Sequence, residues 1–465
     1  MIFIRKISWI LILVFFFIFT SQALAFFGQF TIQDEAELGK KFKILLRSHY
    51  PVIEDPVIVG YLNRIVKRLN SVIPPNPFPF KVAILRDNSL NAFAAPAGYI
   101  FIHSGLILKM DSSSELAAIL AHEMAHVTQR HIAGNIERSK IISIGSLVGV
   151  LAGALIGQSS AVGEALAVGS MAGGQAAALK FSREDEREAD RYGLQYLNMS
   201  DFDPKGMLES FQMLRRQGLL GGRGTPPPYM MTHPGLSERI GYVKDLIARL
   251  PKSESNVLIE DEPLDRAKMM LRSRYSSIDS AKVYFDEKKN FNCLDLLGKG
   301  IILERMNRMC QARKALEKAL ACNGGDALFY REVGRFYYQQ GDFNKALTYL
   351  NKALDNNPKD YFAQYFLSRT LAEKGQIKES VEQMRKVVKA LPEDSDVHYS
   401  YGRILGQNGE PFLGYLHYAY ASLYSGNKEK TKYYMSRAGE RADTPSERER
   451  FKKFKKKYET IKKYW

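Results

Sequence analysis

Three side chains of this sequence have the spacing of a catalytic metal site: His122, Glu123 and His126, in the pattern H-E-x-x-H. Residues four apart lie on one face of a helix, so both imidazoles can bind the same divalent ion. Glu123 lies beside them and can take a proton from the water that attacks a substrate. By composition alone such a pattern arises in roughly one chain of this size in a hundred, so it is only moderately specific.

A catalytic zinc site also needs a third protein ligand and one open position. The charged stretch 182–190 supplies the candidate, because Glu186 and Asp190 lie one helical turn apart on the same face. We expect Glu186 to bind the metal. Asp190 is expected to accept an N–H from a ligating histidine, which would fix the tautomer of that ring. A salt-bridged surface helix is the alternative for this stretch.

Other ionisable residues near these motifs are predicted to face solvent. A helix is expected from 112 to about 131, and His131 would lie about 140° from His126 around it. We therefore exclude His131 as a ligand and expect it on the surface. Glu184 and Glu188 point away from the face of Glu186 and are expected to be solvated.

The two motifs together resemble those of gluzincin metallopeptidases of the HtpX and CAAX prenyl-protease type. The resemblance implies a mainly α-helical catalytic domain with a small β-sheet, one Zn²⁺ per chain, and hydrolysis of peptide bonds. His233-Pro234 with Arg239-Ile240 matches an H-P-x-x-x-x-R-I motif of these enzymes. In relatives with repeats, that histidine can occupy the fourth position of zinc and keep the enzyme latent. We expect His233 to be this regulatory ligand, with a plain loop histidine as the alternative; Arg239 would contact substrate or hold the loop.

The resemblance also implies a substrate-binding strand beside the active site. The matching residues are Asn91, Ala92, Phe93 and Ala94, between strands expected at 80–85 and 99–103. An edge strand can pair with an extended substrate backbone, which gives binding without strict sequence preference. A plain hairpin connection is the alternative. The sequence does not single out a residue that would stabilise the oxyanion.

The first 25 residues predict export. Arg5 and Lys6 precede a short apolar run and an A-x-A site that ends at Ala25, which is the arrangement of a cleavable signal peptide. An uncleaved anchor helix is the alternative, although the run is shorter than the ~20 residues that a span needs. We assign residues 26–255 to the catalytic domain and expect a periplasmic location.

An apolar, glycine-rich stretch at 141–179, uncharged from 141 to 163, interrupts the catalytic domain. Gly145, Gly149 and Gly153 recur every fourth residue, which resembles the packing of membrane helices through small side chains. The second half of the stretch is short for a return span. We predict a lid or a hairpin on the membrane surface; a transmembrane hairpin and a buried packing hairpin are the alternatives.

Beyond the catalytic domain, a 34-residue period predicts an α-solenoid. Gly341, Gly375 and Gly409 show this period, which is typical of tetratricopeptide repeats. We assign the repeats to 265–440 and a basic helix or tail to 441–465. The tail either caps the array or lies on anionic lipid.

The cysteine content excludes a disulfide-stapled scaffold, because there are three cysteines in 465 residues. Their positions within the repeat would let Cys293 and Cys322 approach each other on antiparallel helices, and would leave Cys310 over. A disulfide between the first two and three buried free thiols are both compatible with the sequence.

Composition and charge narrow the functional class. Hydrophobic residues make up 45% and charged residues 25%, as in globular proteins, and the mean hydropathy of −0.25 excludes a polytopic membrane protein. The net charge of +16 favours an anionic partner such as a membrane surface, whereas export argues against nucleic acid.

Signal peptide, catalytic domain and repeats together resemble periplasmic proteases of protein quality control. The resemblance implies degradation of unfolded or stalled outer-membrane β-barrel proteins, with the repeats binding the β-barrel assembly machinery or guiding substrate. An assembly adaptor that acts through its repeats with little proteolysis is the main alternative. A scaffold with a structural zinc site is a third.

Overall fold

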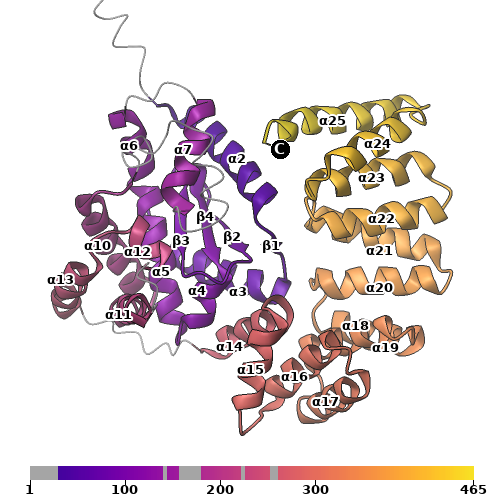
Figure 1. Cartoon of the computed structure of the whole chain (residues 1–465), viewed down its shortest axis with the longest axis horizontal. Helices are drawn as coiled ribbons and strands as arrows, with labels where there is room; N and C mark the ends of the chain where they lie inside the picture. Colours follow the sequence, from indigo (N-terminus) through magenta and orange to yellow (C-terminus); the bar gives the residue numbers. More distant parts are fainter. Residues whose placement is uncertain (1–29, 140–143, 157–179, 221–225, 252–259, 465) are drawn as a thin grey trace, which may run out of the picture.

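The computed structural model describes residues 30–139, 144–156, 180–220, 226–251 and 260–464. The expected signal peptide and residues 157–179 of the glycine-rich stretch lie outside these ranges. The fold is mainly helical with one small sheet, as the sequence predicts. A catalytic half precedes an array of paired helices that curves beside it (Figure 1).

A four-stranded sheet forms the centre of the catalytic half, with the strand order β1-β2-β4-β3. Its strands are β1 (Val52–Ile53), β2 (Lys81–Leu85), β3 (Ala92–Ala95) and β4 (Tyr99–His103). β2 and β4 are parallel, whereas β1 and β3 run antiparallel to their neighbours. β3 therefore lies at an edge of the sheet, and it forms a hairpin with β4 through the turn Pro96–Gly98.

Helices pack around this sheet. They are α2 (Ile32–His49), α3 (Pro56–Asn70), α4 (Ser104–Lys109), α5 (Ser113–Thr128), α6 (His131–Ser139), α7 (Ile144–Ile156), α10 (Arg183–Met199), α11 (Lys205–Leu220), α12 (Pro228–Thr232) and α13 (Leu236–Arg249). α5 is the central helix, and nearly all its residues are buried. α10 packs along it and begins with a capping box, in which Ser182 and Asp185 satisfy each other's backbone N–H groups.

The helix that carries H-E-x-x-H is shorter than predicted. α5 ends at Thr128, not near His131, because Arg130 takes a left-handed conformation with φ 52°. The first helix is interrupted there, and His131 begins a separate helix, α6. Helical angles counted from α5 therefore do not apply to His131.

The first part of the glycine-rich stretch is a buried packing helix. Leu147, Val148 and Leu151 of α7 share a core cluster with Leu38 and Phe42 of α2. Among the described residues, no helix combines the length and the apolar character needed to cross a bilayer. A methyl group added at Gly149 would meet nothing within 4 Å, so this glycine is not needed for close helix packing. The predicted lid or surface hairpin falls mainly on residues outside the described ranges.

The second half of the chain is built from consecutive helices. They are α14 (Glu262–Met270), the π-helical turn η2 (Leu271–Tyr275), α15 (Ile278–Glu287), α16 (Cys293–Arg305), α17 (Met309–Cys322), α18 (Ala327–Gln339), α19 (Phe343–Asn356), α20 (Tyr361–Glu373), α21 (Ile377–Ala390), α22 (Ser395–Gln407), α23 (Pro411–Tyr424), α24 (Lys428–Gly439), α25 (Pro445–Ile461) and the 3₁₀ turn η3 (Lys462–Tyr464). The three periodic glycines stand between paired helices with φ 75–80°, a conformation that favours glycine. This explains their 34-residue period.

The first helical hairpin carries a disulfide. Cys293 begins α16 and Cys322 ends its antiparallel partner α17, and the two are bonded with their Cα atoms 5.4 Å apart. Cys310 is free and exposed. The alternative of three buried free thiols is therefore wrong.

The basic tail forms a helix that covers the end of the array. Phe454, Tyr458 and Ile461 of α25 are buried in a cluster with residues of α23, including Phe412 and Leu416. The lysines between these positions point outwards, and most are exposed. An amphipathic helix in this position removes the apolar end of the last repeat from water.

The two halves contact each other at both ends of the array. Near its start, the buried guanidinium of Arg331 lies 3.2 Å from Asp55, the N-cap of α3, and 3.4 Å from Asp360. Near its end, Glu393 pairs with Lys43 and Arg47 of α2. The array thus leaves the catalytic half at α14 and returns to it at α2 (Figure 1).

A buried histidine pair should make the repeats sensitive to acid. His398 donates from Nε2 to the Pro392 carbonyl, so its Nδ1 accepts from Nδ1 of His417 at 2.8 Å. Burial lowers the pKa of His398 to about 4 and that of His417 well below its usual value. The unfolded chain takes up protons below about pH 6.5 while the folded pair stays neutral, so stability must fall as the pH falls from 6.5 towards 4.

We expect His398 alone to lower the free energy of unfolding by about 2 kcal/mol between pH 7.5 and pH 5. Urea unfolding at the two pH values measures this loss. The double variant His398→Phe/His417→Phe should lose that part of the pH dependence. An equal fall in the variant would show that other groups cause it.

Candidate active site

Four buried donor groups converge on one point between α5, α10 and the end of α12. They belong to His122, His126, Glu186 and His233, and one ligand atom from each lies within 4.8 Å of all the others. The side chains of all four are at most 1% exposed. The structure thus brings together the three ligands expected from spacing and the fourth expected from the family motif.

The distances between these donors suit a tetrahedral metal ion. Donors about 2.1 Å from a common ion in a tetrahedron lie roughly 3.4 Å from one another. Nε2 of His122 lies 3.0 Å from Nε2 of His126 and 3.4 Å from Nδ1 of His233. The Glu186 carboxylate lies 3.5 Å from each of the first two rings and 2.9 Å from the third. Three imidazoles and a carboxylate are ligands that zinc accepts.

Asp190 orients the first histidine from behind. Its Oδ1 lies 3.0 Å from Nδ1 of His122, which leaves Nε2 of that ring facing the other donors. Burial favours a neutral carboxyl group, but Arg239 and His122 outweigh it and lower the pKa of Asp190 to about 2. The carboxylate is therefore ionised at neutral pH and can hold the proton on Nδ1.

The charge of the cluster also fits a cation. Burial would raise the pKa of Glu186, but His233 and Arg239 hold it well below its usual value. Burial would lower the pKa of His122, yet Asp190 and Glu186 raise it to about 9. The carboxylates therefore favour positive charge at this point, which a divalent ion would supply.

Arg239 lies inside the protein, against the carboxylates of Asp190 and Glu186. It is 2% exposed, and it binds Asp190 through Nε at 2.8 Å and through Nη2 at 2.6 Å. Its Nη1 lies 2.5 Å from Glu186. Tyr242, on the next turn of α13, also donates to Asp190. Of the two roles expected for Arg239, these contacts favour the holding role, because the side chain ties α13 to both carboxylates of α10.

The second histidine is oriented by His131, which the sequence places on the surface. His131 is 5% exposed, and its Nδ1 lies 2.8 Å from Nδ1 of His126. With Nε2 of His126 directed at the other donors, its Nδ1–H donates to His131, and Nε2–H of His131 donates to Glu188 at 3.1 Å. The surface prediction fails because the left-handed Arg130 breaks the helix, and His131 then lies against His126 of α5. The Glu188 side chain remains 37% exposed, so it is partly solvated while it accepts from His131.

We expect His131→Phe to weaken metal binding by about 10–100-fold, because the ring of His126 would lose its acceptor. Competition with a chelator measures this affinity without any substrate. His49→Phe removes an exposed histidine and is the control, for which no change is expected. Unchanged affinity in His131→Phe would show that Phe181, stacked on His126 at 3.8 Å, suffices to hold the ring.

Glu123 lies between the donor cluster and the edge strand. Its Oε2 accepts the Ala94 N–H at 2.7 Å, and its Oε1 lies 3.5 Å from Nε2 of His233. Oε1 of Glu123, Nε2 of His233 and the hydroxyl of Tyr229 are buried without a hydrogen-bond partner among the described residues. Buried polar atoms without partners are costly, so this is where a water or a substrate group would fit.

The strand edge is blocked in this state. Asn91, Ala92, Phe93 and Ala94 are all fully buried. Tyr229 of α12 donates its backbone N–H to the Leu90 carbonyl at 3.1 Å, just before β3, while Glu123 takes the N–H of Ala94. An incoming strand would have to displace both. The segment that carries His233 therefore covers the strand as well as the metal position.

Comparison with known proteins agrees with this geometry. Residues 59–247 match the model of peptidase family M48, and 297–361 and 337–404 match tetratricopeptide-repeat models. The Escherichia coli β-barrel assembly-enhancing protease is 30% identical over 332 residues, which cover 70% of this chain and 67% of that protein.

Two further relatives align over shorter regions. A Vibrio cholerae protein of the same name is 34% identical over 253 residues, or 54% of this chain and about half, 51%, of that protein. The mitochondrial metalloendopeptidase OMA1 of Schizosaccharomyces pombe is 28% identical over 44% of this chain and 58% of its own length. With the buried His/Glu cluster and the repeats, these matches show that the chain belongs to peptidase family M48, among its members that carry tetratricopeptide repeats.

Proposed function

We propose that the chain is a zinc-dependent endopeptidase of the bacterial periplasm that degrades unfolded or stalled outer-membrane β-barrel proteins. The observation that carries the proposal is the buried four-donor cluster with Glu123 beside it, directly under an edge strand. His122, His126 and Glu186 would hold one Zn²⁺ per chain. The ion would polarise the scissile carbonyl and lower the pKa of the attacking water.

The chain's own residues would supply the remaining steps. The backbone of Ala92–Ala95 would align an extended substrate once α12 is displaced. Glu123 would then exchange the Ala94 N–H for the attacking water, take its proton and deliver it to the leaving amine. Asp190 and His131 would keep the two ligating rings in the required tautomers.

His233 would hold the enzyme latent. Its Nδ1 lies where a fourth ligand would, and catalytic sites need that position open. The segment 228–233 would act as one plug, since it also occupies the carbonyl of Leu90. Activity would therefore depend on what moves this segment.

The substrate and location are supported by the named relatives and by the leader-like sequence at residues 1–25. Binding without side-chain preference suits unfolded chains, because an edge strand reads backbone groups. The repeats would bind the β-barrel assembly machinery or guide substrates to the plug.

The test compares three substrates of similar length with the mature chain and its His233→Ala variant, both loaded with zinc: an unfolded outer-membrane β-barrel, the same barrel folded in detergent, and an unfolded soluble protein. We expect cleavage of both unfolded chains and none of the folded barrel. Preference for the unfolded barrel over the soluble protein would support recognition by the repeats. Binding of the barrel without cleavage of any substrate would favour the adaptor function instead.

A further inference from the structure

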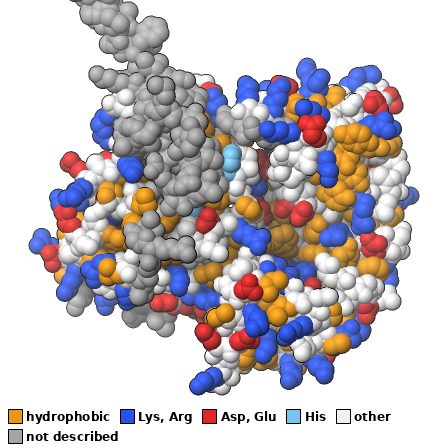
Figure 2. All heavy atoms as spheres, in the orientation of Figure 1, with side chains coloured by type: hydrophobic (Ala, Val, Ile, Leu, Met, Phe, Trp, Pro, Cys, Tyr) orange, Lys and Arg blue, Asp and Glu red, His pale blue; other side chains and the backbone are white. Residues whose placement is uncertain are grey.

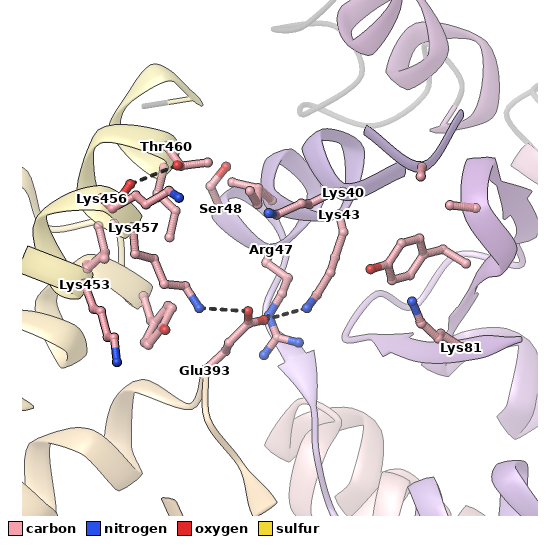
Figure 3. Close-up of a pocket in the computed structure, with 18 of the residues that line it drawn as sticks. Lys40, Lys43, Arg47, Ser48, Lys81, Glu393, Lys453, Lys456, Lys457 and Thr460 are labelled. Carbon is pink, nitrogen blue, oxygen red and sulfur yellow. Dashed lines mark hydrogen bonds and ion pairs between the residues drawn. The ribbon is translucent and has the colours of Figure 1, made fainter. Parts of the chain in front are cut away.

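A strongly basic cleft lies between α2 and α25, where the repeat array returns to the catalytic half (Figure 3). It encloses about 560 Å³. Seven cationic side chains line it, from α2, from the start of β2 and from α25: Lys40, Lys43, Arg47, Lys81, Lys453, Lys456 and Lys457. Glu393 is the one carboxylate among the described lining residues, and it comes from the loop before α22.

Glu393 neutralises only part of this charge. It lies 2.8 Å from Lys43, 3.3 Å from Lys457 and 3.5 Å from Arg47. Burial favours its neutral form, but these cations lower its pKa to about 2, so it carries a full negative charge at neutral pH. Arg47 has a second partner, Glu54, at 2.9 Å.

The other four cations are available to a ligand. In the described part of the chain, Lys40, Lys81 and Lys456 have no carboxylate partner. Lys453 has only an exposed neighbour on its own helix, Glu449, at 3.9 Å. These four positive charges come from three elements, and carboxylates of the described residues neutralise little of them. An anion bound among them would offset their repulsion.

The walls of the cleft are apolar between these charges. Ile44 of α2 and Ile461 of α25 face the cleft with Leu423, Tyr424 and Tyr99. Lys81 lies with its Nζ 4.8 Å from the centre of the Tyr99 ring, which keeps the ammonium group at the rim. The lining thus suits a molecule that has a compact negative group and an apolar part.

We infer that this cleft binds the phosphate headgroup of an anionic lipid. Lysines supply six of the seven cations, and ammonium groups bind phosphate as point charges from any direction, whereas arginine forks favour planar groups. The volume falls within the usual range for a site of this kind. Clusters of Lys and Arg on an amphipathic helix, such as those of α25, are a known mode of anionic-lipid recognition.

The surface around the cleft supports a lipid rather than a soluble anion. α25 and η3 carry further exposed lysines outside the cleft, at positions 452, 455, 462 and 463. In Figure 2, lysine and arginine side chains gather along the edge of the molecule formed by α25. A headgroup in the cleft would place this edge on an anionic leaflet and would join α2 to the end of the array. This inference does not depend on the proposed peptidase activity.

The test is sedimentation of the mature chain, residues 26–465, with vesicles of phosphatidylglycerol and phosphatidylcholine at about 0.15 M salt. The variant Lys40→Ala/Lys81→Ala/Lys456→Ala removes the unpaired charges of the cleft. The control Lys359→Ala/Lys452→Ala/Lys455→Ala removes as many exposed charges outside it, two of them on α25. Both variants should weaken binding, and we expect the cleft variant to weaken it at least about tenfold more than the control does. Thermal unfolding checks that both variants are folded.

Other outcomes overturn the inference. Equal losses in the two variants would mean that α25 attracts the membrane through its overall charge and that the cleft holds no headgroup. Titration with glycerol 3-phosphate and inorganic phosphate distinguishes the source of the anion. If these bind saturably and depend on the three lysines while the vesicles do not bind, the ligand is a soluble phosphate compound. If an acidic peptide releases the bound vesicles and the phosphate compounds do not, the cleft is a site for a protein.

Discussion

Replacing Glu123 with Gln is expected to lower the rate of casein cleavage by at least about 10²–10⁴-fold and to leave the metal content unchanged. Gln is nearly the same size, and its carbonyl oxygen can still accept the N–H of Ala94, which Oε2 of Glu123 accepts at 2.7 Å. It cannot take a proton from water. The loss would therefore appear in kcat rather than in metal binding or in folding.

Cleavage assays, metal analysis and thermal unfolding of the same samples check this prediction. Glu184→Gln is the matched control, because Glu184 is exposed on α10 close to Glu186. Full cleavage by Glu123→Gln would remove Glu123 as the general base. Loss of metal would instead mean that Glu123 helps to hold the ion.

His233→Ala is expected to raise the cleavage rate about tenfold or more. If α12 is open in less than about a tenth of the molecules, removing the fourth donor can raise the fraction of molecules able to cleave by about tenfold or more. The remaining donors, His122, His126 and Glu186, are sufficient for a catalytic site. The substitution also leaves Tyr229, stacked on His233 at 4.3 Å, without its neighbour, which should loosen the cover over β3.

The control for this variant is Met231→Ala, which shortens a half-buried side chain of the same segment and retains the imidazole. We expect Met231→Ala to stay latent. The result that contradicts latency is a His233→Ala chain that loses its metal and unfolds more easily without gaining activity. A closed structural site would behave in that way.

The two outcomes also bear on the repeats. If Glu123→Gln is inactive and His233→Ala is activated, the repeats serve a gated peptidase. If neither variant nor the parent chain cleaves any substrate while metal is bound, the repeats become the functional surface and the adaptor function gains support.

Features that depend on local spacing could be predicted from the amino-acid sequence. An interval of four residues on one helix places His122 and His126 together, and the same interval relates Glu186 to Asp190. The 34-residue period follows from a left-handed glycine in each turn, such as Gly341. Such patterns survive folding because neighbours along a helix or a repeat are neighbours in space.

Features that depend on interrupted helices and on contacts between distant segments could be seen only in the folded protein. The positive φ of Arg130 ended α5 early and made His131 the support of His126. Long-range packing buried Arg239 against Asp190. The repeat pattern already allowed Cys293 and Cys322 to approach each other, and the structure decided between a disulfide and free thiols.

The basic cleft could not be predicted from the sequence either, because its walls come from α2 and α25, at opposite ends of the chain. Spacing along a sequence carries no information about such contacts, since they are set by how whole elements pack.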